Sequence, residues 1–452
     1  MKIQKGHLTT LMLASAAILP LCALHAQLGS TNPPAGPRGV YAITHAKIVP
    51  ITAPEIANGT LVIGADGRIQ AVGANVPIPT GAKVIDATGL SVYPGMMDGG
   101  TSMGLSEIGQ GAESTVDVTE VGSFNPNVQA FFGINPHSAH VGVTRVVGVT
   151  HVVSSPKGGI LSGQAALINL SGSTPPEMVL IQKVAMAISL PGAFGGGRGF
   201  GRGGFAAGGA SANSDASRLR TRQIDSLRTM LHDAEAYAKA FDAYAKDKSL
   251  PRPKSDVVLA SLVPVIQGKM YAMFTAERAA DIRDAVNFAD EFHMKPIIVG
   301  GAEALKVAPF LKQHDVPVLI TGVRQLPRLE DDAPDVNYSL PGKLVAAGVR
   351  IAITSGDGGP MVRDLPSVAG MAAAFGLSKT DALKSVTIWP AQIFGVGDKL
   401  GSLEAGKLAN VVVTTGDILE ARTDTKYLFI DGRPVPLDTR HTELYMQFKD
   451  RP

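Results

Sequence analysis

Hydrophobic and polar positions follow a strand-like period at both ends of the chain. The runs 60–63 and 69–72 flank Asp66-Gly67, a dipeptide that is typical of a tight hairpin turn. Short β-type runs return at 409–414 and 427–430. We therefore expect these two β-rich segments, which bracket the chain, to pair into one small domain built from both ends.

Between these segments, short apolar runs alternate with helical patterns. Ile282, Val286, Ala289 and Phe292 lie on one face of a predicted helix, and residues 305–312 repeat the pattern. Strands are predicted at 151–153, 165–169, 270–274, 296–299, 316–320 and 350–354. Such alternation predicts parallel strands with crossover helices, and hence an α/β fold. A closed TIM-like (β/α)8 barrel fits the pattern better than a doubly wound open sheet.

One stretch interrupts this alternation. Residues 192–209 are a Gly-rich, low-complexity tract, and a polar helix is predicted at 217–246. An RNA-binding Arg-Gly segment is one interpretation, but the tract holds only Arg198 and Arg202. We therefore interpret 192–216 as a surface insertion.

The first 26 residues have the pattern of a secretory signal peptide. Lys2 and Lys5 precede an apolar run, and Ala26 offers a cleavage site. A membrane-spanning helix would need about 20 apolar residues, which this run does not supply. A lipid anchor on Cys22 is disfavoured, because Leu21 stands where a small residue is expected. We predict cleavage after Ala26, export to the periplasm and no membrane span in the mature chain.

The composition of the chain argues against several classes of function and site. The 452 residues carry 41 Lys and Arg against 39 Asp and Glu, and this net charge of +2 gives no electrostatic case for nucleic acid. A single cysteine excludes a disulfide framework and a Cys-based zinc site. Aromatic residues make up only 5%, which disfavours a stacking platform for bases or sugars.

Several segments resemble the amidohydrolase superfamily, in its imidazolonepropionase-like branch. Residues 84–89 and 93–98 resemble the step from the family's β-sandwich into its first barrel strand. Residues 376–396 and 401–410 resemble its closing helices and the return to the sandwich. The resemblance covers nearly all of residues 41–437.

This resemblance implies a division of the chain. A Pro/Gly-rich lead-in would occupy 27–40, and a composite β-sandwich would combine 41–95 with 396–440. An amidohydrolase-like barrel would occupy 96–395 and carry the Gly-rich insertion.

The resemblance also implies a chemistry. Active members hydrolyse non-peptide carbon–nitrogen bonds with water activated on one or two divalent metals. Their ligands are a His-x-His after the first strand, single histidines after the fifth and sixth, and an aspartate after the eighth. Here Gly100 and Ser102 stand at the first motif, Thr275 and Glu277 follow the fifth strand, and Gly300 follows the sixth.

Only Asp357, after the eighth strand, remains as a candidate metal ligand. Glycine offers no ligand atom and a serine hydroxyl is a poor one, so the usual metal centre is not expected, and neither is a cofactor. The first hypothesis is a degenerate member that acts as a binding or partner subunit, as a homo-oligomer or beside an intact relative. The alternative is an active amidohydrolase with a carboxylate-rich site around Asp357, Glu277 and Asp98. That site would need a divalent metal, zinc or manganese, and carboxylates alone would suit Ca²⁺, Mg²⁺ or Mn²⁺ better.

A third hypothesis is a binding protein for a small polar or anionic ligand in the barrel mouth. Residues that directly follow barrel strands face this mouth. The binding candidates chosen on this basis are Asp98, Ser102, Glu107, Lys157 and Glu303. Lys157 lies in a Gly- and Ser-rich loop whose backbone amides could cradle an anion. For Asp98 the simpler interpretation is a hydrogen bond to strand-end backbone, and for Glu277 and Glu303 a stabilising charge at a helix start.

Overall fold

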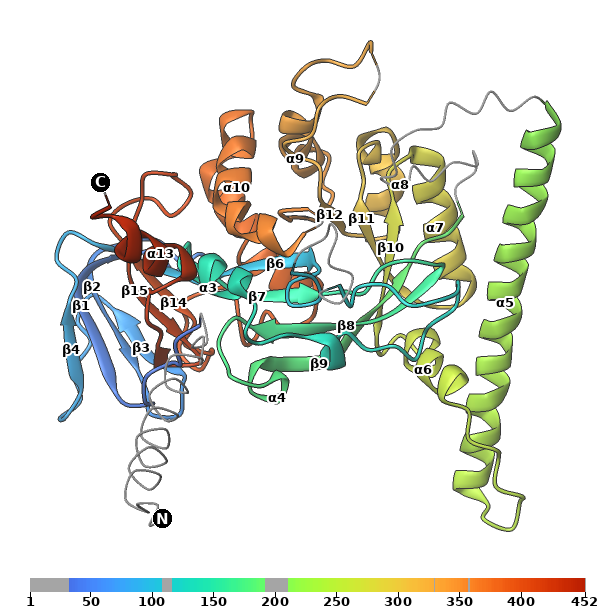
Figure 1. The fold of residues 1–452 in the computed structure, drawn as a ribbon, viewed down its shortest axis with the longest axis horizontal. Coiled ribbons are helices and arrows are strands. Elements are labelled where there is room, and N and C mark those ends of the chain that lie inside the picture. The colour runs from blue at the N-terminus through green and yellow to red at the C-terminus, as the bar shows by residue number, and fades with distance from the viewer. Residues whose placement is uncertain (1–31, 108–115, 192–209, 329, 357, 452) are drawn as a thin grey trace, which may run out of the picture.

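A computed structural model describes residues 32–107, 116–191, 210–328, 330–356 and 358–451, without the side chains of 210–216. Figure 1 shows two parts side by side, a sheet domain made from both ends of the chain and a larger barrel made from its middle. The predicted signal peptide, most of the Gly-rich insertion and Asp357 lie outside the described residues.

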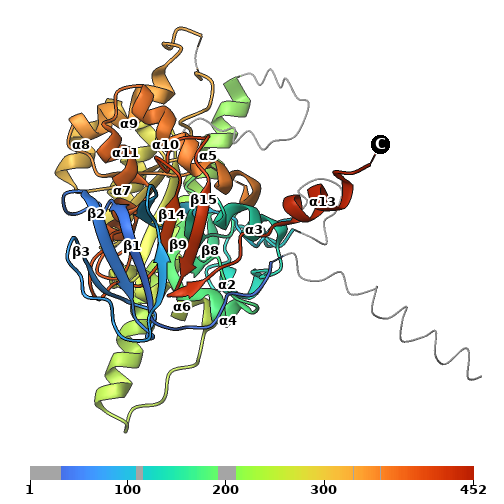
Figure 2. The same cartoon turned by 90° about the vertical axis from the view of Figure 1, so that its left-hand side faces the viewer.

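The sheet domain joins the two ends of the chain as expected. Its strand order is β16-β15-β14-β5-β1-β2-β3, with β4 paired to β1. The strands are β1 (Tyr41–Ile48), β2 (Ile56–Ile63), β3 (Ile69–Gly73), β4 (Lys83–Asp86), β5 (Ser91–Pro94), β14 (Val411–Thr414), β15 (Thr425–Ile430) and β16 (Arg433–Pro434). The predicted hairpin is β2–β3, and Gly67 at its turn has φ +82°, which favours glycine. Antiparallel pairing of β5 with β14 links the N-terminal strands to the C-terminal ones, and Figure 2 shows this sheet from its own side.

The middle of the chain forms a nearly closed barrel of eight strands. Their order is β13-β12-β11-β10-β9-β8-β7-β6, and β13 also lies next to β6. The strands are β6 (Met96–Thr101), β7 (Val149–Ser154), β8 (Leu161–Asn169), β9 (Val179–Ile188), β10 (Tyr271–Ala276), β11 (Lys295–Gly300), β12 (Val318–Ile320) and β13 (Ile351–Ile353). The TIM-like α/β fold predicted from the sequence is thus confirmed.

The interior of this barrel is filled by side chains from its own strands. One hydrophobic cluster takes residues from every strand, among them Met97, Val153, Met273 and Leu319. This packing is the usual filling of such a barrel. Space for a ligand is therefore expected at the ends of the strands and not along the barrel axis.

One part of the barrel departs from the predicted strand–helix alternation. β8 pairs antiparallel with both β7 and β9, so it runs against the other seven strands. The connection 155–160 is too short for a crossover helix, which needs a dozen or more residues. Gly158 and Gly159 turn the chain there with φ +89° and +70°. The sequence pattern predicted no strand at 179–188, where β9 lies.

Helices cover the outside of the barrel and the ends of its strands. They are α2 (Ala130–Gly133), α3 (Ala139–Arg145), α4 (Pro175–Met178), α5 (Ala210–Lys246), α6 (Val257–Ile266), α7 (Ala279–Glu291), α8 (Ala308–Gln313), α9 (Val336–Ala346), α10 (Leu365–Ala374), α11 (Lys379–Ser385), α12 (Ile388–Ile393) and α13 (Arg440–Phe448), with 3-10 turns η2 (Ala304–Val307) and η3 (Gly359–Asp364). α7 buries Ile282, Val286 and Ala289 as predicted, whereas the helix expected at 305–312 is divided into η2 and α8. In the described part of the chain, no helix has the length and apolar character needed to cross a membrane.

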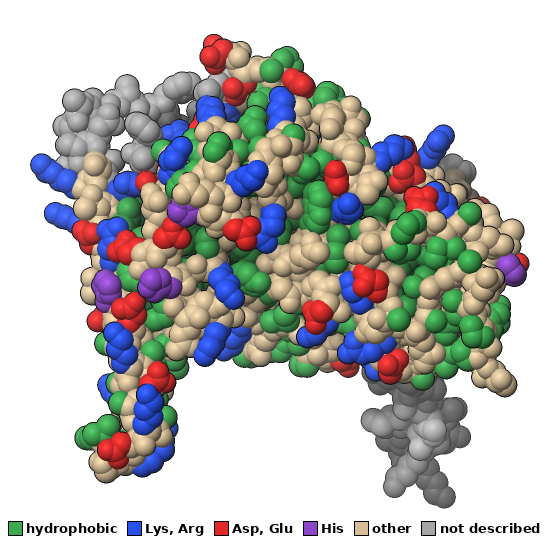
Figure 3. All heavy atoms as spheres, turned by 180° about the vertical axis from the view of Figure 1, so that it is seen from behind, with side chains coloured by type: hydrophobic (Ala, Val, Ile, Leu, Met, Phe, Trp, Pro, Cys, Tyr) green, Lys and Arg blue, Asp and Glu red, His purple; other side chains and the backbone are tan. Residues whose placement is uncertain are grey.

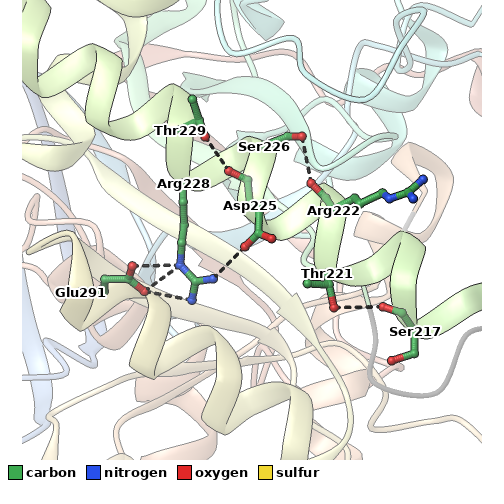
Figure 4. Close-up of polar contacts among 8 residues, drawn as sticks. All are labelled: Ser217, Thr221, Arg222, Asp225, Ser226, Arg228, Thr229 and Glu291. Atoms are coloured by element: carbon green, nitrogen blue, oxygen red, sulfur yellow. Dashed lines mark hydrogen bonds and ion pairs between the residues drawn. The ribbon is translucent and has the colours of Figure 1, made fainter. Parts of the chain in front are cut away.

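The long helix α5 lies along one flank of the barrel and packs on α6 (Figure 1). It begins at Ala210, earlier than the predicted 217. Its own residues Leu227 and Leu231 are buried. Arg228 of α5 forms an ion pair with Glu291 of α7, with 2.9 Å between Nε and Oε1. Figure 4 shows this pair together with Asp225, which also contacts Arg228. Buried leucines, this ion pair and a second one between Arg220 and Asp284 of α7 therefore hold α5 on the barrel.

Candidate functional site

A cavity of about 400 Å³ opens at the barrel mouth, where seven strands end and the reversed β8 begins. The residues that line it lie next to strand ends and include Gly100, Thr101, Ser155, Lys157, Ser162, Ser189, Thr275, Glu277, Gly300, Thr321, Gln325 and Gly356. Of the predicted site residues in the described part of the chain, Lys157 and Glu277 line this cavity. Among its described lining residues, these two are also the only cationic and the only acidic side chain.

Asp98 lies on β6 and is completely buried. Its Oδ1 accepts a hydrogen bond from the Gly100 amide at 3.0 Å, and its Oδ2 accepts from the Ser355 amide at 3.0 Å and from the Ser355 hydroxyl. Burial raises the pKa of Asp98 to about 6, although these hydrogen bonds act to lower it. The carboxyl group thus joins the end of β6 to the loop after β13, which agrees with the backbone role expected from the sequence.

Glu277 and Glu303 tie two neighbouring loops together. Glu277 accepts from the Ala302 amide at 2.9 Å, and Glu303 accepts from the Ala279 amide at 2.9 Å, at the start of α7. Burial raises the pKa of Glu277, while the Ala279 hydrogen bond, followed by the Lys306 contact, lowers the pKa of Glu303. Both carboxylates therefore satisfy backbone donors after β10 and β11.

Gly300 and Gly100 differ in the space around them. Gly300 has φ +107°, and a Cβ atom there would lie 2.5 Å from Oε1 of Glu277. At Gly100 the nearest atom to such a Cβ is Cγ2 of Thr354, at 3.8 Å. The Glu277 side chain thus occupies the volume that any side chain at position 300 would need, whereas position 100 has room.

Lys157 brings a partly buried positive charge to the mouth. Its backbone amide donates to the Val118 carbonyl at 2.7 Å, which fixes the loop after β7. Burial lowers the pKa of the Lys157 ammonium to about 8, while the charge of Asp98 acts in the opposite direction. The Lys157 side chain thus brings a positive charge to the wall of the cavity.

Ser102 and Glu107 do not line this cavity. Ser102 is buried, and Glu107 accepts from Ser138 at the start of α3 at 3.0 Å and from Asn135 at 3.3 Å. His140, which the sequence places three residues after His137, contacts the backbone carbonyl of Glu107 at 3.1 Å through Nε2. Glu107 therefore holds the start of α3.

The described residues at the positions where the resemblance expects metal ligands offer few donor atoms. Gly100 and Gly300 offer no donor atom, and both oxygens of Asp98 accept hydrogen bonds from protein groups. Within the described ranges, no three His, Cys, Asp or Glu side chains are grouped so that they could hold a metal ion. Asp357, the candidate ligand chosen from the sequence, lies outside these ranges.

Thr321 and Gln325 are among the polar groups of the mouth that sequence reasoning missed. Thr321 directly follows β12, and Gln325 lies a few residues further along the same loop. The rule that selects residues after barrel strands would have found Thr321 if it had been applied to neutral side chains as well as charged ones.

Comparisons with known proteins agree with this architecture. A sequence model of the amidohydrolase family matches residues 267–435. The solved structure of an amidohydrolase from Thermotoga maritima MSB8 superposes with a TM-score of 0.76 at 24% identity, covering 87% of this chain and 99% of that one. A prolidase complexed with N-methylphosphonate-L-proline gives 0.52 at 16% identity, covering 88% and 99% of the two chains. A molinate hydrolase gives 0.53 at 16% identity, covering 89% and 95%.

No curated protein matches the sequence. Residues 267–435 correspond to the segment from β10 to β16, which supplies the second half of the barrel and the return to the sheet domain. Residues 267–435 thus match the amidohydrolase family, and the chain shares the fold of a solved amidohydrolase.

Proposed function

We propose that this chain is an imidazolonepropionase-like amidohydrolase relative that binds a small, singly charged anion in its barrel mouth without metal-dependent hydrolysis. One observation carries the proposal. The buried carboxylate of Asp98 and the partly exposed carboxylate of Glu277 accept hydrogen bonds from backbone amides, while the Lys157 side chain lines the cavity. The polar groups that a metal-binding mouth would direct at its ion are here used to hold the barrel loops.

The lining suggests the class of ligand. A cavity of about 400 Å³ suits a small metabolite. Lys157 supplies one positive charge, and the hydroxyls of Thr275 and Thr321 with the Gln325 carboxamide supply neutral hydrogen-bonding groups. A compact amide or cyclic amide that bears one carboxylate would match both features.

Binding of 2-pyrrolidone-5-carboxylate, a cyclic amide with one carboxylate, tests the proposal by calorimetry. We expect Lys157→Met to lose most of the affinity, because a charge-assisted hydrogen bond contributes about 1.5–3 kcal/mol. Lys379→Met is the matched control, since Lys379 is exposed and lines a different pocket. Equal binding by the wild type and Lys157→Met would contradict the proposal.

The hydrolase alternative makes an opposite prediction for metal content. The protein is dialysed with zinc, manganese and calcium in turn, and retained metal is measured by elemental analysis. We expect no tightly held ion. About one ion per chain that is lost in Asp357→Ala, together with turnover of cyclic amides, would establish the active enzyme with a carboxylate-rich site.

Export and a partner belong to the same proposal. The signal pattern before residue 27 supports cleavage after Ala26 and a periplasmic location. N-terminal sequencing of the protein recovered from the periplasmic fraction tests both. A partner role predicts a homo-oligomer, or a complex with an intact relative, in size-exclusion chromatography of that material.

A further inference from the structure

A second cavity, of about 290 Å³, lies at the opposite end of the barrel from the mouth. Its walls come from the lead-in at residues 32–38, the last residue of α3, the end of β8 and the β15–β16 turn. Asn169 at the end of β8 pairs with His151 near the start of β7, which places this cavity at the N-terminal ends of the parallel strands. The sheet domain and the barrel meet here, and α3 lies at their junction (Figures 1 and 2). We call it the base cavity.

The base cavity is lined by a buried arginine that has no counter-charge. Arg145 is only 2% exposed, and its Nη2 donates to the Pro33 carbonyl at 3.1 Å. Its Nε has no hydrogen-bond partner, and no carboxylate in the described part of the chain forms an ion pair with it. A buried charge without a partner is costly, and proteins normally pair it or neutralise it.

A neighbouring amide presents a further donor. The Oδ1 atom of Asn410 accepts from the Asp431 amide at 2.8 Å, so the Nδ2 atom of Asn410 must be its donor. That Nδ2 donates to Oδ1 of Asn169 at 3.0 Å. The orientation of the Asn169 carboxamide is thereby fixed, and its Nδ2 donates no hydrogen bond to the described residues. Asn169 lines the base cavity beside Arg145.

The other charges around the base cavity leave a positive excess. Arg38 and Asp431 form an ion pair with each other. Glu177 accepts from the Ser173 amide at 2.9 Å. With Arg433 also in the wall, three arginines stand against two carboxylates, and both carboxylates already have partners.

We propose that the base cavity binds a small anion, through a carboxylate or phosphate group that accepts hydrogen bonds from Arg145 and Asn169. The anion supplies the counter-charge that Arg145 lacks, and a guanidinium is the side chain best suited to such groups. This site is independent of the mouth ligand, because it lies at the other end of the barrel and contains none of the mouth residues.

Titration calorimetry of the full chain with inorganic phosphate and with malonate, at constant ionic strength in sodium chloride, tests this proposal. We expect at least one of these anions to bind. Arg145→Met should weaken that binding at least about tenfold, since the lost contact is a charge-assisted hydrogen bond. Asn169→Asp should also weaken it, because an isosteric carboxylate repels the anion and still accepts from Asn410.

Two control variants test whether the effect is specific to Arg145 or follows from the loss of any cationic side chain. Arg350→Met removes an exposed arginine that pairs with Asp315, and it should leave binding unchanged. Lys157→Met should also leave it unchanged, because Lys157 belongs to the mouth. If Arg145→Met fails to fold, Asn169→Asp alone decides the question.

Three results would overturn the proposal. The wild type could show no binding of either anion up to about 10 mM, an affinity too weak for a built site. Arg145→Met and Asn169→Asp could bind as tightly as the wild type. Finally, Lys157→Met alone could abolish binding, which would assign the anion to the mouth and would support only the proposed function.

Discussion

The two ends of the barrel differ in how well their buried charged side chains are hydrogen-bonded. At the mouth, Asp98 is fully buried, but its carboxyl group accepts three hydrogen bonds from Gly100 and Ser355. At the base, Arg145 is equally buried, but it has one carbonyl acceptor and an Nε atom without a partner. The mouth is the end where a family resemblance directs attention, yet the hydrogen-bonding capacity of its buried carboxylate Asp98 is already used by protein donors.

This difference separates structural charges from charges that await a ligand. A buried polar group that is fully hydrogen-bonded holds its surroundings in one arrangement, and removing it leaves its donors unsatisfied. A buried charge that lacks partners is instead a cost that a bound ligand can offset. By this criterion Asp98 stabilises the barrel, and Arg145 identifies a binding site. Charge on the outer surface gives no such guide, because cationic and anionic side chains are mixed over the face shown in Figure 3.

The largest expected effect is a pH dependence of stability caused by Asp98. Its pKa is about 6 in the folded protein against an ordinary value of 3.8, so the folded state holds this proton more tightly than the unfolded chain. The free energy of unfolding should therefore fall as pH rises, by about 2 kcal/mol between pH 4 and pH 6 and by about 3 kcal/mol over the whole titration. Denaturant unfolding across this range measures the change.

Asp98→Ala provides the comparison, because it removes the titrating group. The difference in the free energy of unfolding between the wild type and the variant should decrease as pH rises, and the wild type should be the more stable protein at pH 4. At that pH the variant leaves the Gly100 and Ser355 amides without their acceptor, at about 1–3 kcal/mol each. A difference that does not change with pH would contradict a raised pKa at Asp98.

A smaller effect on the free energy of unfolding is expected at two glycines, which stand at positions that the resemblance assigns to histidines. Gly300→Ala should lower the free energy of unfolding by about 2 kcal/mol, because φ +107° strains an L-residue and its Cβ would meet the Glu277 carboxylate. Gly100→Ala should cost less than about 0.5 kcal/mol, since its Cβ meets only ordinary contacts. Thermal unfolding of both variants checks the difference. Equal losses would mean that Glu277 does not occupy the space of a side chain at position 300.

The sequence predicted which segments become strands better than it predicted their direction. An apolar run such as 165–169 has the same period whether it runs up or down the barrel, so the reversal of β8 was not visible in it. Only the short connection 155–160 carried that information, because it leaves no room for a crossover helix.

The candidate residues show a similar limit. Lys157 and Glu277 were selected because they follow strands, and both line the mouth cavity, whereas Asp98 accepts hydrogen bonds from backbone amides. Whether a carboxylate is satisfied depends on amides from distant loops, as Ala302 shows for Glu277. Arg145 was not selected, because the sequence alone does not show which helix-end arginine becomes buried without a partner.

The base of the barrel gives a prediction of intermediate size. Arg145→Met should leave the free energy of unfolding unchanged or raise it by up to about 1 kcal/mol, because replacing a poorly paired buried charge by an apolar side chain removes its desolvation cost. Denaturant unfolding in a buffer without phosphate or carboxylate measures this. A loss of about 3–5 kcal/mol, the typical effect of breaking a buried ion pair, would instead indicate that Arg145 already has a counter-charge.

The smallest expected effect concerns a charge that is neither buried nor in need of a ligand. Arg228 on α5 pairs with Glu291, but its side chain is 41% exposed and that of Glu291 is 38% exposed. Arg228→Met should therefore lower the free energy of unfolding by no more than about 0.5 kcal/mol, and the loss should shrink in high salt. Leu231→Ala on the same helix is the matched control, and it should cost about 2–5 kcal/mol because Leu231 is buried. A larger loss from Arg228→Met than from Leu231→Ala would show that charge holds α5 on the barrel, and burial would then no longer serve as the criterion that separates the two ends.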